Sequence, residues 1–120
     1  MLLFTCNALA GELQIENGSV SNITRTSADI YGEIISTNAT NAAITLFYGT
    51  SDGSTNSTNW AYSNYYGTAG TGIISTNVTG LAPSQLYYYR WYAFDSVSNV
   101  HDWADYSSNF WTKAGAPTST

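Results

Sequence analysis

The residues that could carry acid–base or metal chemistry are few in this sequence and lie near its C-terminal end. His101 is the only histidine, and its direct neighbour Asp102 cannot reach around to orient the imidazole as a catalytic triad requires. Four oxygen donors of this region that could bind Ca²⁺ are Asp95, Asn99, Asp102 and Asp105. Their spacing lacks the glycine and closing glutamate of an EF-hand loop, which favours solvated loop acids. We therefore expect no enzyme, no catalytic residue, no metal site and no cofactor.

Aromatic side chains are the more promising candidates, because they make up 15% of the chain. Residues 86–95 alternate with period two, as in a strand. If Tyr87 points inward, Trp91 points inward as well, and the residues at positions 88, 90, 92 and 94 point outward. The outward set, with the residues expected beside it on neighbouring strands, is Phe47, Tyr88, Arg90, Tyr92, Phe94 and Trp111. Large exposed apolar patches with Tyr, Trp and Arg usually mark an interface or ligand face. Cover by loops or by one another is the alternative, and a sugar platform is a third.

A second aromatic group follows the loop at residues 52–59 and comprises Trp60, Tyr62, Tyr65 and Tyr66. We expect Trp60 to pack at the rim of the fold, and we expect the same of Trp103. Exposed Trp and Tyr near Asn and Asp could instead stack on sugar rings, although no distinctive spacing supports this.

Strands must position these side chains, since the sequence alternates with period two and contains no helical segment. We expect strands at residues 13–23, 27–34, 43–48, 60–66, 72–79, 86–95 and 109–112. Turn signals such as Asp52-Gly53 separate them at the spacing of a sandwich. The prediction is an all-β, immunoglobulin-like or fibronectin type III-like β-sandwich of about seven antiparallel strands.

One motif refines this prediction. Leu81, Pro83 and Tyr87 resemble the tyrosine corner of fibronectin type III domains, where a Leu-x-Pro turn precedes a tyrosine that bonds back to the turn backbone. The resemblance covers roughly residues 18–113. Over this range the sequence is similar to divergent bacterial and environmental members of the family. Gly32 stands where many members carry a core tryptophan, and Trp91 could fill that volume. The Arg-Gly-Asp adhesion tripeptide is absent, so integrin-type recognition has no support.

The two ends of the chain differ from its body. Residues 1–17 form an apolar N-terminal segment. We expect it to be either a signal remnant or a connector strand between subunits. Its expected connector residues are Leu2, Leu3, Phe4 and Leu9. The lone Cys6 excludes an internal disulfide, and residues 114–120 resemble a linker. Whether the chain is complete or part of a multidomain protein stays open.

Composition limits the partners. Three Lys and Arg face eight Asp and Glu, so the chain cannot neutralise a run of phosphates, and nucleic acid is excluded as a partner. No apolar run is long enough for a membrane span. The chain contains 16 Thr, 15 Ser and 11 Asn, which provide the polar surface that charged residues usually provide. Such a composition is typical of extracellular, cell-surface or virion-surface proteins. Five N-x-S/T sequons, at Asn17, Asn22, Asn38, Asn56 and Asn77, are possible glycosylation sites.

Two non-enzymatic functions follow. The first is an extracellular structural protein that self-assembles with copies of itself into a filament or surface layer, through the N-terminal segment and the aromatic face. The alternative is a module of a larger secreted protein that binds carbohydrate or another surface protein. A small enzyme built around His101 ranks third.

Overall fold

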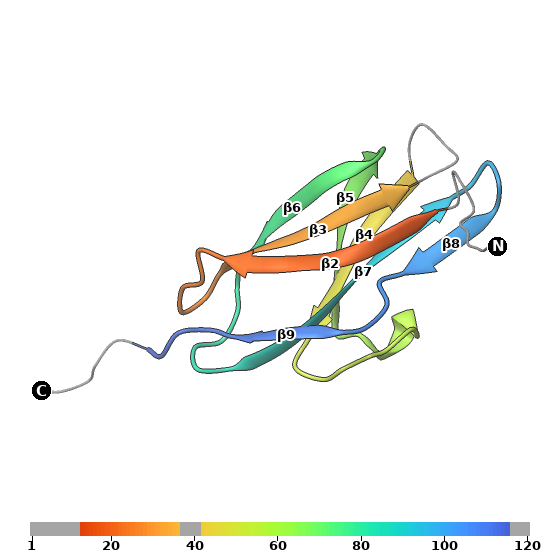
Figure 1. Cartoon of the computed structure of the whole chain (residues 1–120). Coiled ribbons are helices and arrows are strands. Elements are labelled where there is room, and N and C mark those ends of the chain that lie inside the picture. The colour runs from red at the N-terminus through yellow and green to blue at the C-terminus, as the bar shows by residue number, and fades with distance from the viewer. Residues whose placement is uncertain (1–12, 37–41, 116–120) are drawn as a thin grey trace, which may run out of the picture.

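A computed structural model describes residues 13–36 and 42–115 as two antiparallel β-sheets packed face to face (Figure 1). The strands are β2 (Gln14–Ser21), β3 (Ala28–Ser36), β4 (Ala42–Gly49), β5 (Tyr62–Ala69), β6 (Gly72–Val78), β7 (Leu86–Asp95), β8 (Val100–Trp103) and β9 (Ser108–Trp111). The only helical turn among the described residues is a 3₁₀ turn, η1 (Ser57–Asn59). The all-β sandwich expected from the alternation is confirmed, with eight strands within residues 13–36 and 42–115 where about seven were expected.

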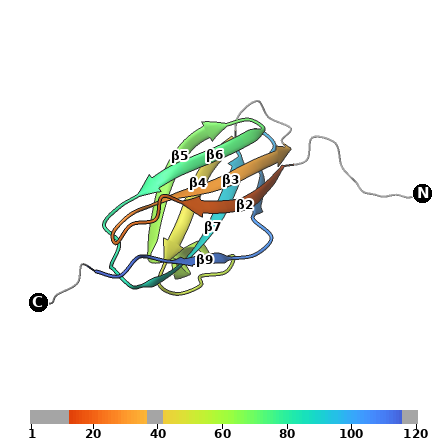
Figure 2. The same cartoon turned by 60° about the vertical axis from the view of Figure 1, so that its left-hand side comes forward.

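The two sheets differ in size. One has three strands in the order β2-β3-β6, and the other has the order β5-β4-β7-β8, with β9 also paired to β7 (Figure 2). The strand after β7 is therefore split. β8 pairs with the end of β7, at Tyr92 to Asp95, and β9 pairs with its beginning, at Leu86 to Tyr89. The split leaves the middle of β7, at Arg90 and Trp91, without a strand on that side.

The short strand β8 was missed by the sequence analysis. Its four residues, Val-His-Asp-Trp, are too few and too polar for the alternation that identified the other strands. β8 forms because the turn after β7 returns the chain along the same strand, and Asp95 organises that turn. Its carboxylate accepts hydrogen bonds from the backbone N–H of Val97 (3.0 Å) and the hydroxyl of Ser98 (2.8 Å). The Ser98 hydroxyl is the main reason why the pKa of Asp95 is lowered.

The core lies between the sheets and follows the predicted alternation. Ala28, Ile30 and Ile34 of β3 are buried against the inward residues of β4 and β7. Trp91 is fully buried, and its ring lies against Gly32, where a Cβ atom would come within 2.6 Å of the indole nitrogen. The expectation that Trp91 fills the volume above this glycine is confirmed.

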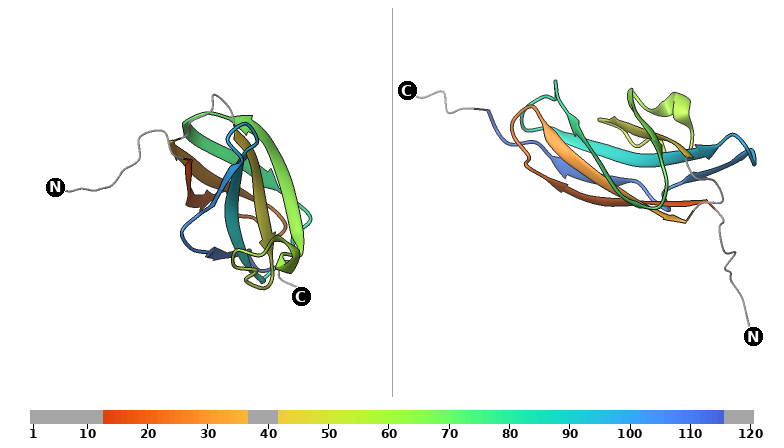
Figure 3. Two further views of the ribbon diagram at one scale, coloured as in Figure 1. Left: turned by 90° about the vertical axis from the view of Figure 1, so that its right-hand side faces the viewer. Right: turned by 90° about the horizontal axis from the view of Figure 1, so that it is seen from above.

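Side chains join the two sheets at both edges. On one side the backbone N–H of Ile15 in β2 donates to a carboxylate oxygen of Asp102 in β8 (2.9 Å). On the other, the amide of Asn64 in β5 donates to the hydroxyl of Thr76 in β6 (3.3 Å), and these strands lie side by side in Figures 1 and 2. The two layers, seen from the end and from above in Figure 3, are thus tied together at their rims.

Asn17 of β2 supplies hydrogen bonds in the gap between β8 and β9. Its Oδ1 accepts a hydrogen bond from the backbone N–H of Trp91 (3.0 Å), and its Nδ2 donates to the Tyr106 carbonyl (3.0 Å) and the Ser108 hydroxyl (3.0 Å). One amide therefore satisfies the β7 backbone in the gap between β8 and β9, where a continuous strand would have done so.

The turn before β7 has the contact that defines a tyrosine corner. The Tyr87 hydroxyl accepts a hydrogen bond from the backbone N–H of Ala82 (2.8 Å), while Leu81 is buried in the core and Pro83 is exposed. Gly80 before the turn has φ of +73°, a backbone conformation that favours glycine. The turn thereby fixes the start of β7 and the phase of its alternation.

Candidate ligand groove

The loop between β4 and β5 folds over Trp60 and is the first part of the candidate site. Trp60 is only 6% exposed, and its indole N–H donates to the Ser54 carbonyl (3.0 Å). Gly53 lies so close to the ring that a Cβ atom there would come within 2.5 Å of it. Asn56 caps the turn η1 by accepting from the backbone N–H of Thr58 (3.0 Å). The loop is therefore packed on Trp60 and braced by its own hydrogen bonds.

A polar chain attaches this loop to the outer face of the five-stranded sheet. The Ser107 hydroxyl donates to a carboxylate oxygen of Asp52 (2.6 Å) and accepts from a guanidinium nitrogen of Arg90 (3.4 Å). Arg90 also donates through Nε to the Ala104 carbonyl (2.8 Å). The Ser107 hydrogen bond is the largest cause of the lowered pKa of Asp52, and the Ser54 N–H and Arg90 charge act in the same direction. Arg90 thus fills the outer side of the gap in the split strand.

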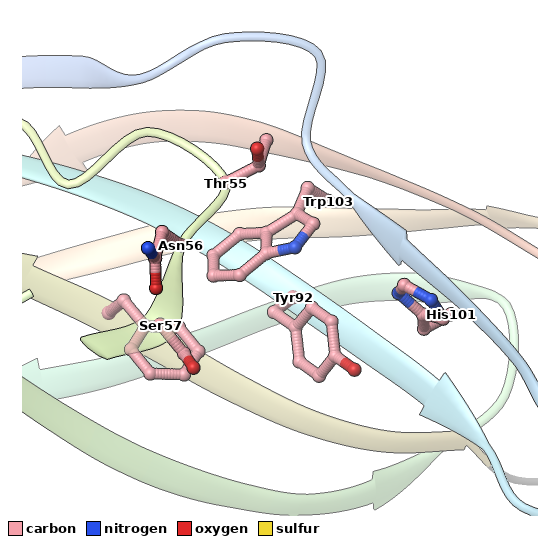
Figure 4. Close-up of a pocket in the computed structure, with 7 residues that line it drawn as sticks. Thr55, Asn56, Ser57, Tyr92, His101 and Trp103 are labelled. Atoms are coloured by element: carbon pink, nitrogen blue, oxygen red, sulfur yellow. The ribbon is translucent and has the colours of Figure 1, made fainter. Parts of the chain in front are cut away.

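An open groove of about 460 Å³ lies between the loop and the sheet (Figure 4). Its lining comprises Phe47, Thr55, Asn56, Ser57, Tyr92, His101 and Trp103. The Trp103 and Tyr92 ring centroids are 4.7 Å apart, and Phe47 lies 5.1 Å from Trp103. His101 extends the row, with its ring 5.9 Å from that of Tyr92. Aromatic rings thus form the floor, and the loop residues 55–57 form a polar wall.

The polar atoms of the floor have no partner within the described residues. The indole N–H of Trp103 and the hydroxyl of Tyr92 make no hydrogen bond there, although both side chains are half-buried. Desolvation raises the pKa of the Tyr92 hydroxyl, which therefore stays protonated and can donate at neutral pH. Asn56, which also lines the groove, uses only its Oδ1, on the N–H and hydroxyl of Thr58, so its Nδ2 has no partner within the described residues.

The structure divides the predicted aromatic face. Phe47 and Tyr92 meet in the groove, whereas Arg90 is only 8% exposed beneath residues 104–107. Tyr88 and Phe94 are half-buried. Trp111 is 61% exposed but pairs with Leu86, six residues along β7 from the partner of Trp103, or about 20 Å away. Loop cover therefore interrupts the face at Arg90.

Sequence reasoning missed most of the groove. Trp103 was expected at the rim as a structural residue, and His101 was considered only for catalysis. Both lie on β8, whose pairing with β7 places Trp103 beside Tyr92 and His101 beside Phe94. Residues 55–57 appeared only as a loop. The signal that could have found them is the Asp-Gly turn followed by a capped Asn-Ser-Thr segment close to Trp60.

The remaining polar candidates serve the fold. Asp102 points to Ile15 at the sandwich edge while His101 points to the groove, so the two side chains diverge. Asp95 is used by its turn. Among the described residues, no group of three His, Cys, Asp or Glu could hold a metal ion. No helix within them has the length and hydropathy that crossing a membrane would need.

The second aromatic group is divided as well. Trp60 is buried at the base of the loop, and Tyr66 meets the ring of Trp91 edge-on at 6.1 Å. Tyr62 stacks on Tyr48 at 5.3 Å, whereas Tyr65 is exposed. These residues lie on or before the edge strand β5 and do not line the groove.

Four of the five sequons lie within the described residues. The Asn17 amide is used inside the fold, and the amides of Asn22 and Asn77 both donate to Asp29 (2.8 Å each), which lowers the pKa of that carboxyl. Only Asn56 has an amide nitrogen without a partner there. Asn38 lies outside the described residues, as do Cys6 and the connector residues Leu2, Leu3, Phe4 and Leu9.

The comparisons with known proteins show the fold. No protein-family model matches the chain, and no curated protein matches it. Three solved structures that are similar are of the sensor domain of the anti-sigma factor RsgI4 in Pseudobacteroides cellulosolvens. A shorter form has a TM-score of 0.59 and 19% identity, over 85% of this chain and 95% of that one. The solution structure has a TM-score of 0.60 and 20% identity, over 85% and 76%.

The longer form of the same domain covers more of the chain. It has a TM-score of 0.54 and 22% identity, over 90% of this chain and 96% of that one. At such identities the likeness establishes the β-sandwich of two antiparallel sheets and leaves the function to the site.

Proposed function

We propose that this chain is a non-catalytic binding module of extracellular type, and that the groove floored by Phe47, Tyr92 and Trp103 is its ligand site. The observation that carries the proposal is the state of the floor, where half-buried aromatic rings keep their polar atoms free within the described residues. Buried Trp and Tyr normally find hydrogen-bond partners, so a floor that leaves them open is arranged for a ligand.

The architecture supports this proposal in two ways. The loop wall is fixed before any ligand arrives, by Trp60 below and by Asp52 bonded to Ser107 at its side. A preformed wall lowers the ordering cost of binding. The similar solved structures are of a sensor domain, and a sensor requires a binding surface, which fits a binding module better than a catalyst.

Self-assembly, the first hypothesis from the sequence, is less well supported. It requires a continuous exposed aromatic face, and the buried Arg90 interrupts that face between Tyr92 and Trp111. Its other element, the N-terminal connector, lies outside the described residues. The similar structures point to a sensor domain and provide no support for a filament.

The test is a fragment screen of the ¹⁵N-labelled protein by NMR, with a library of monosaccharides, amino-acid amides and small aromatic compounds. We expect hits to shift the indole N–H signal of Trp103 and the backbone signals of residues 55–57 first. Trp103→Ala should abolish these shifts, and the matched control Trp111→Ala should keep them, because Trp111 lies about 20 Å away. Hits that cluster around Trp111, or an absence of hits at the groove, would contradict the proposal.

A further inference from the structure

We infer that the ligand of the groove is a neutral saccharide, held by ring stacking on Trp103 and Tyr92 and by hydrogen bonds to their free polar atoms and to Asn56. This inference rests on the proposed function and narrows it to a ligand class. Three properties of the groove support it: the trough of aromatic rings, the free polar atoms of its lining and the lack of charged side chains in that lining.

The floor suits a ring that is apolar on its face and polar at its rim. Trp103 and Tyr92 are tilted by 50° and Phe47 and Trp103 by 39°, so the rings form a shallow trough of aromatic surface. A pyranose presents C–H groups on its faces and hydroxyls around its edge. Stacking a face on the floor removes apolar surface from water while the hydroxyls still point at the walls.

The free polar atoms match those hydroxyls. The Trp103 N–H, the Tyr92 hydroxyl and the Asn56 Nδ2 belong to residues that line the groove, and they make no hydrogen bond within the described part of the chain. The remaining lining residues Thr55, Ser57 and His101 also make none there through their side chains. Donors and acceptors of this mixed kind pair with hydroxyl groups, which both donate and accept.

Three buried aromatic residues of the same molecule differ from the groove residues in the hydrogen bonding of their polar atoms. The Trp60 N–H donates to Ser54, and the Trp91 N–H donates to the Tyr31 carbonyl (2.9 Å). The hydroxyl of Tyr89 donates to the Gly18 carbonyl (2.6 Å). In these three buried residues the polar atom is bonded inside the protein. The Trp103 N–H and the Tyr92 hydroxyl in the groove have no such partner within the described residues and stay available to a ligand.

The lining contains no carboxylate, ammonium or guanidinium group. The charged side chains that attach the loop to the sheet, Asp52 and Arg90, are linked through Ser107 and are not part of the lining. An anionic ligand would find no cation there and would face a chain of net charge −5. A cationic ligand would find no carboxylate in the lining. A neutral ligand has neither problem.

A peptide is a poorer fit. Extended peptides gain affinity by adding a strand to a free sheet edge. β4 lies between β5 and β7, and β7 is paired with β4 on one side and with β8 and β9 on the other. The strands that carry Phe47 and Tyr92 therefore offer no free backbone edge beneath the groove. The edge strand β8, which carries Trp103, is the place where a peptide could still add, and the peptide arm of the experiment tests it.

The experiment is a calorimetric and NMR titration of the full chain with defined oligosaccharides. The neutral arms are cellohexaose, xylohexaose and mannohexaose, the anionic arm is oligogalacturonate, the cationic arm is chitosan hexamer, and the peptide arm is a set of tyrosine-rich decapeptides. We expect at least one neutral arm to bind, with no measurable binding in the charged arms. Trp103→Ala should weaken that binding about tenfold or more, and Trp111→Ala should leave it within about twofold.

Two gentler variants keep the test independent of folding. Tyr92→Phe removes one free hydroxyl and no core contact, so it should weaken binding about fivefold with an unchanged melting temperature. Asn56→Asp keeps the Oδ1 that caps η1 and removes the free Nδ2, so it should weaken binding about fivefold while the turn stays capped. If a charged saccharide or a peptide binds and Trp103→Ala abolishes it, the inference is wrong and the proposed function stands. If no arm binds and the fragment screen also leaves the groove untouched, both are wrong.

Discussion

Trp91 and Trp103 lie on opposite faces of the same sheet and show two uses of one residue type. Trp91 is fully buried against Gly32, and its N–H is bonded to the Tyr31 carbonyl. Trp103 is half-buried beside Tyr92, and its N–H has no partner within the described residues. The two residues therefore differ both in burial and in the state of the indole N–H, and of the two only Trp103 has an N–H that a ligand could still use.

The first prediction concerns stability and has the largest expected effect. Trp91→Ala should lower the free energy of unfolding by about 3–5 kcal/mol, because it leaves a cavity in the core and an unpaired carbonyl at Tyr31. Trp103→Ala should cost about 1 kcal/mol, because that ring is partly hydrated already. Urea unfolding followed by circular dichroism measures both. Equal losses in the two variants would remove the distinction between the two tryptophans.

Gly32 provides a control for the same comparison. Gly32→Ala should destabilise the protein because the added Cβ meets the Trp91 ring at 2.6 Å. In a Trp91→Leu background the cost should shrink, since the smaller side chain leaves room. Additive effects in this double-mutant cycle would show that the ring and the glycine are not in contact.

The second prediction tests the gap in the split edge strand. Asn17→Ala should cost about 1–3 kcal/mol, because it leaves the Trp91 N–H and the Tyr106 carbonyl without their partner. Asn109→Ala, at an exposed position of β9, should stay within about 0.5 kcal/mol of the parent. Thermal melts of both variants suffice. In a host that glycosylates proteins, folded material should carry no glycan on Asn17.

The third prediction uses two tyrosines of one strand. Tyr87→Phe should lower stability by about 1 kcal/mol, since its hydroxyl accepts the Ala82 N–H. Tyr92→Phe should be near neutral, since its hydroxyl has no partner within the described residues. Paired chemical-denaturation curves would show the difference, and an equal cost at both positions would mean that the Tyr92 hydroxyl is engaged in the free protein.

The fourth prediction is the smallest and concerns the wall of the groove. The pKa of Asp52 is lowered by the Ser107 hydroxyl, so its folded pKa lies below its unfolded value near 3.8. Its contribution is therefore present above the unfolded pKa and is lost as the pH falls through the lowered pKa. Asp52→Asn should be slightly less stable than the parent at about pH 7, and the difference should shrink as the pH falls through the lowered pKa.

Asp105→Asn is the matched control, because that exposed side chain makes no hydrogen bond within the described residues. Its stability difference from the parent should not follow the same profile between neutral and acidic pH. A loss in Asp52→Asn that persists at acidic pH would show that the loop is held by packing on Trp60 instead.

The alternation of β3, β4 and β7 determined the sandwich from the sequence alone, because a period of two assigns each side chain to a face before any neighbour is known. The resemblance to fibronectin type III domains implied that Trp91 fills the space at Gly32, 59 positions away. The period of two itself placed Trp91 inward and Tyr92 outward, which is a local property of the chain. The tyrosine corner belongs to the same class, since Leu81, Pro83 and Tyr87 are close in sequence.

Only the tertiary structure decided the groove. Trp103 and Tyr92 are eleven residues apart and meet because the short strand β8 turns back along β7. Residues 55–57 become a wall because Trp60 and the contact between Asp52 and Ser107, 55 positions apart, bring the loop over the sheet. Arg90, expected outside, is buried because the gap in the split strand accepts it. Long-range contacts of this kind leave no period in a sequence, so only the folded chain shows which outward side chains are covered and which are free.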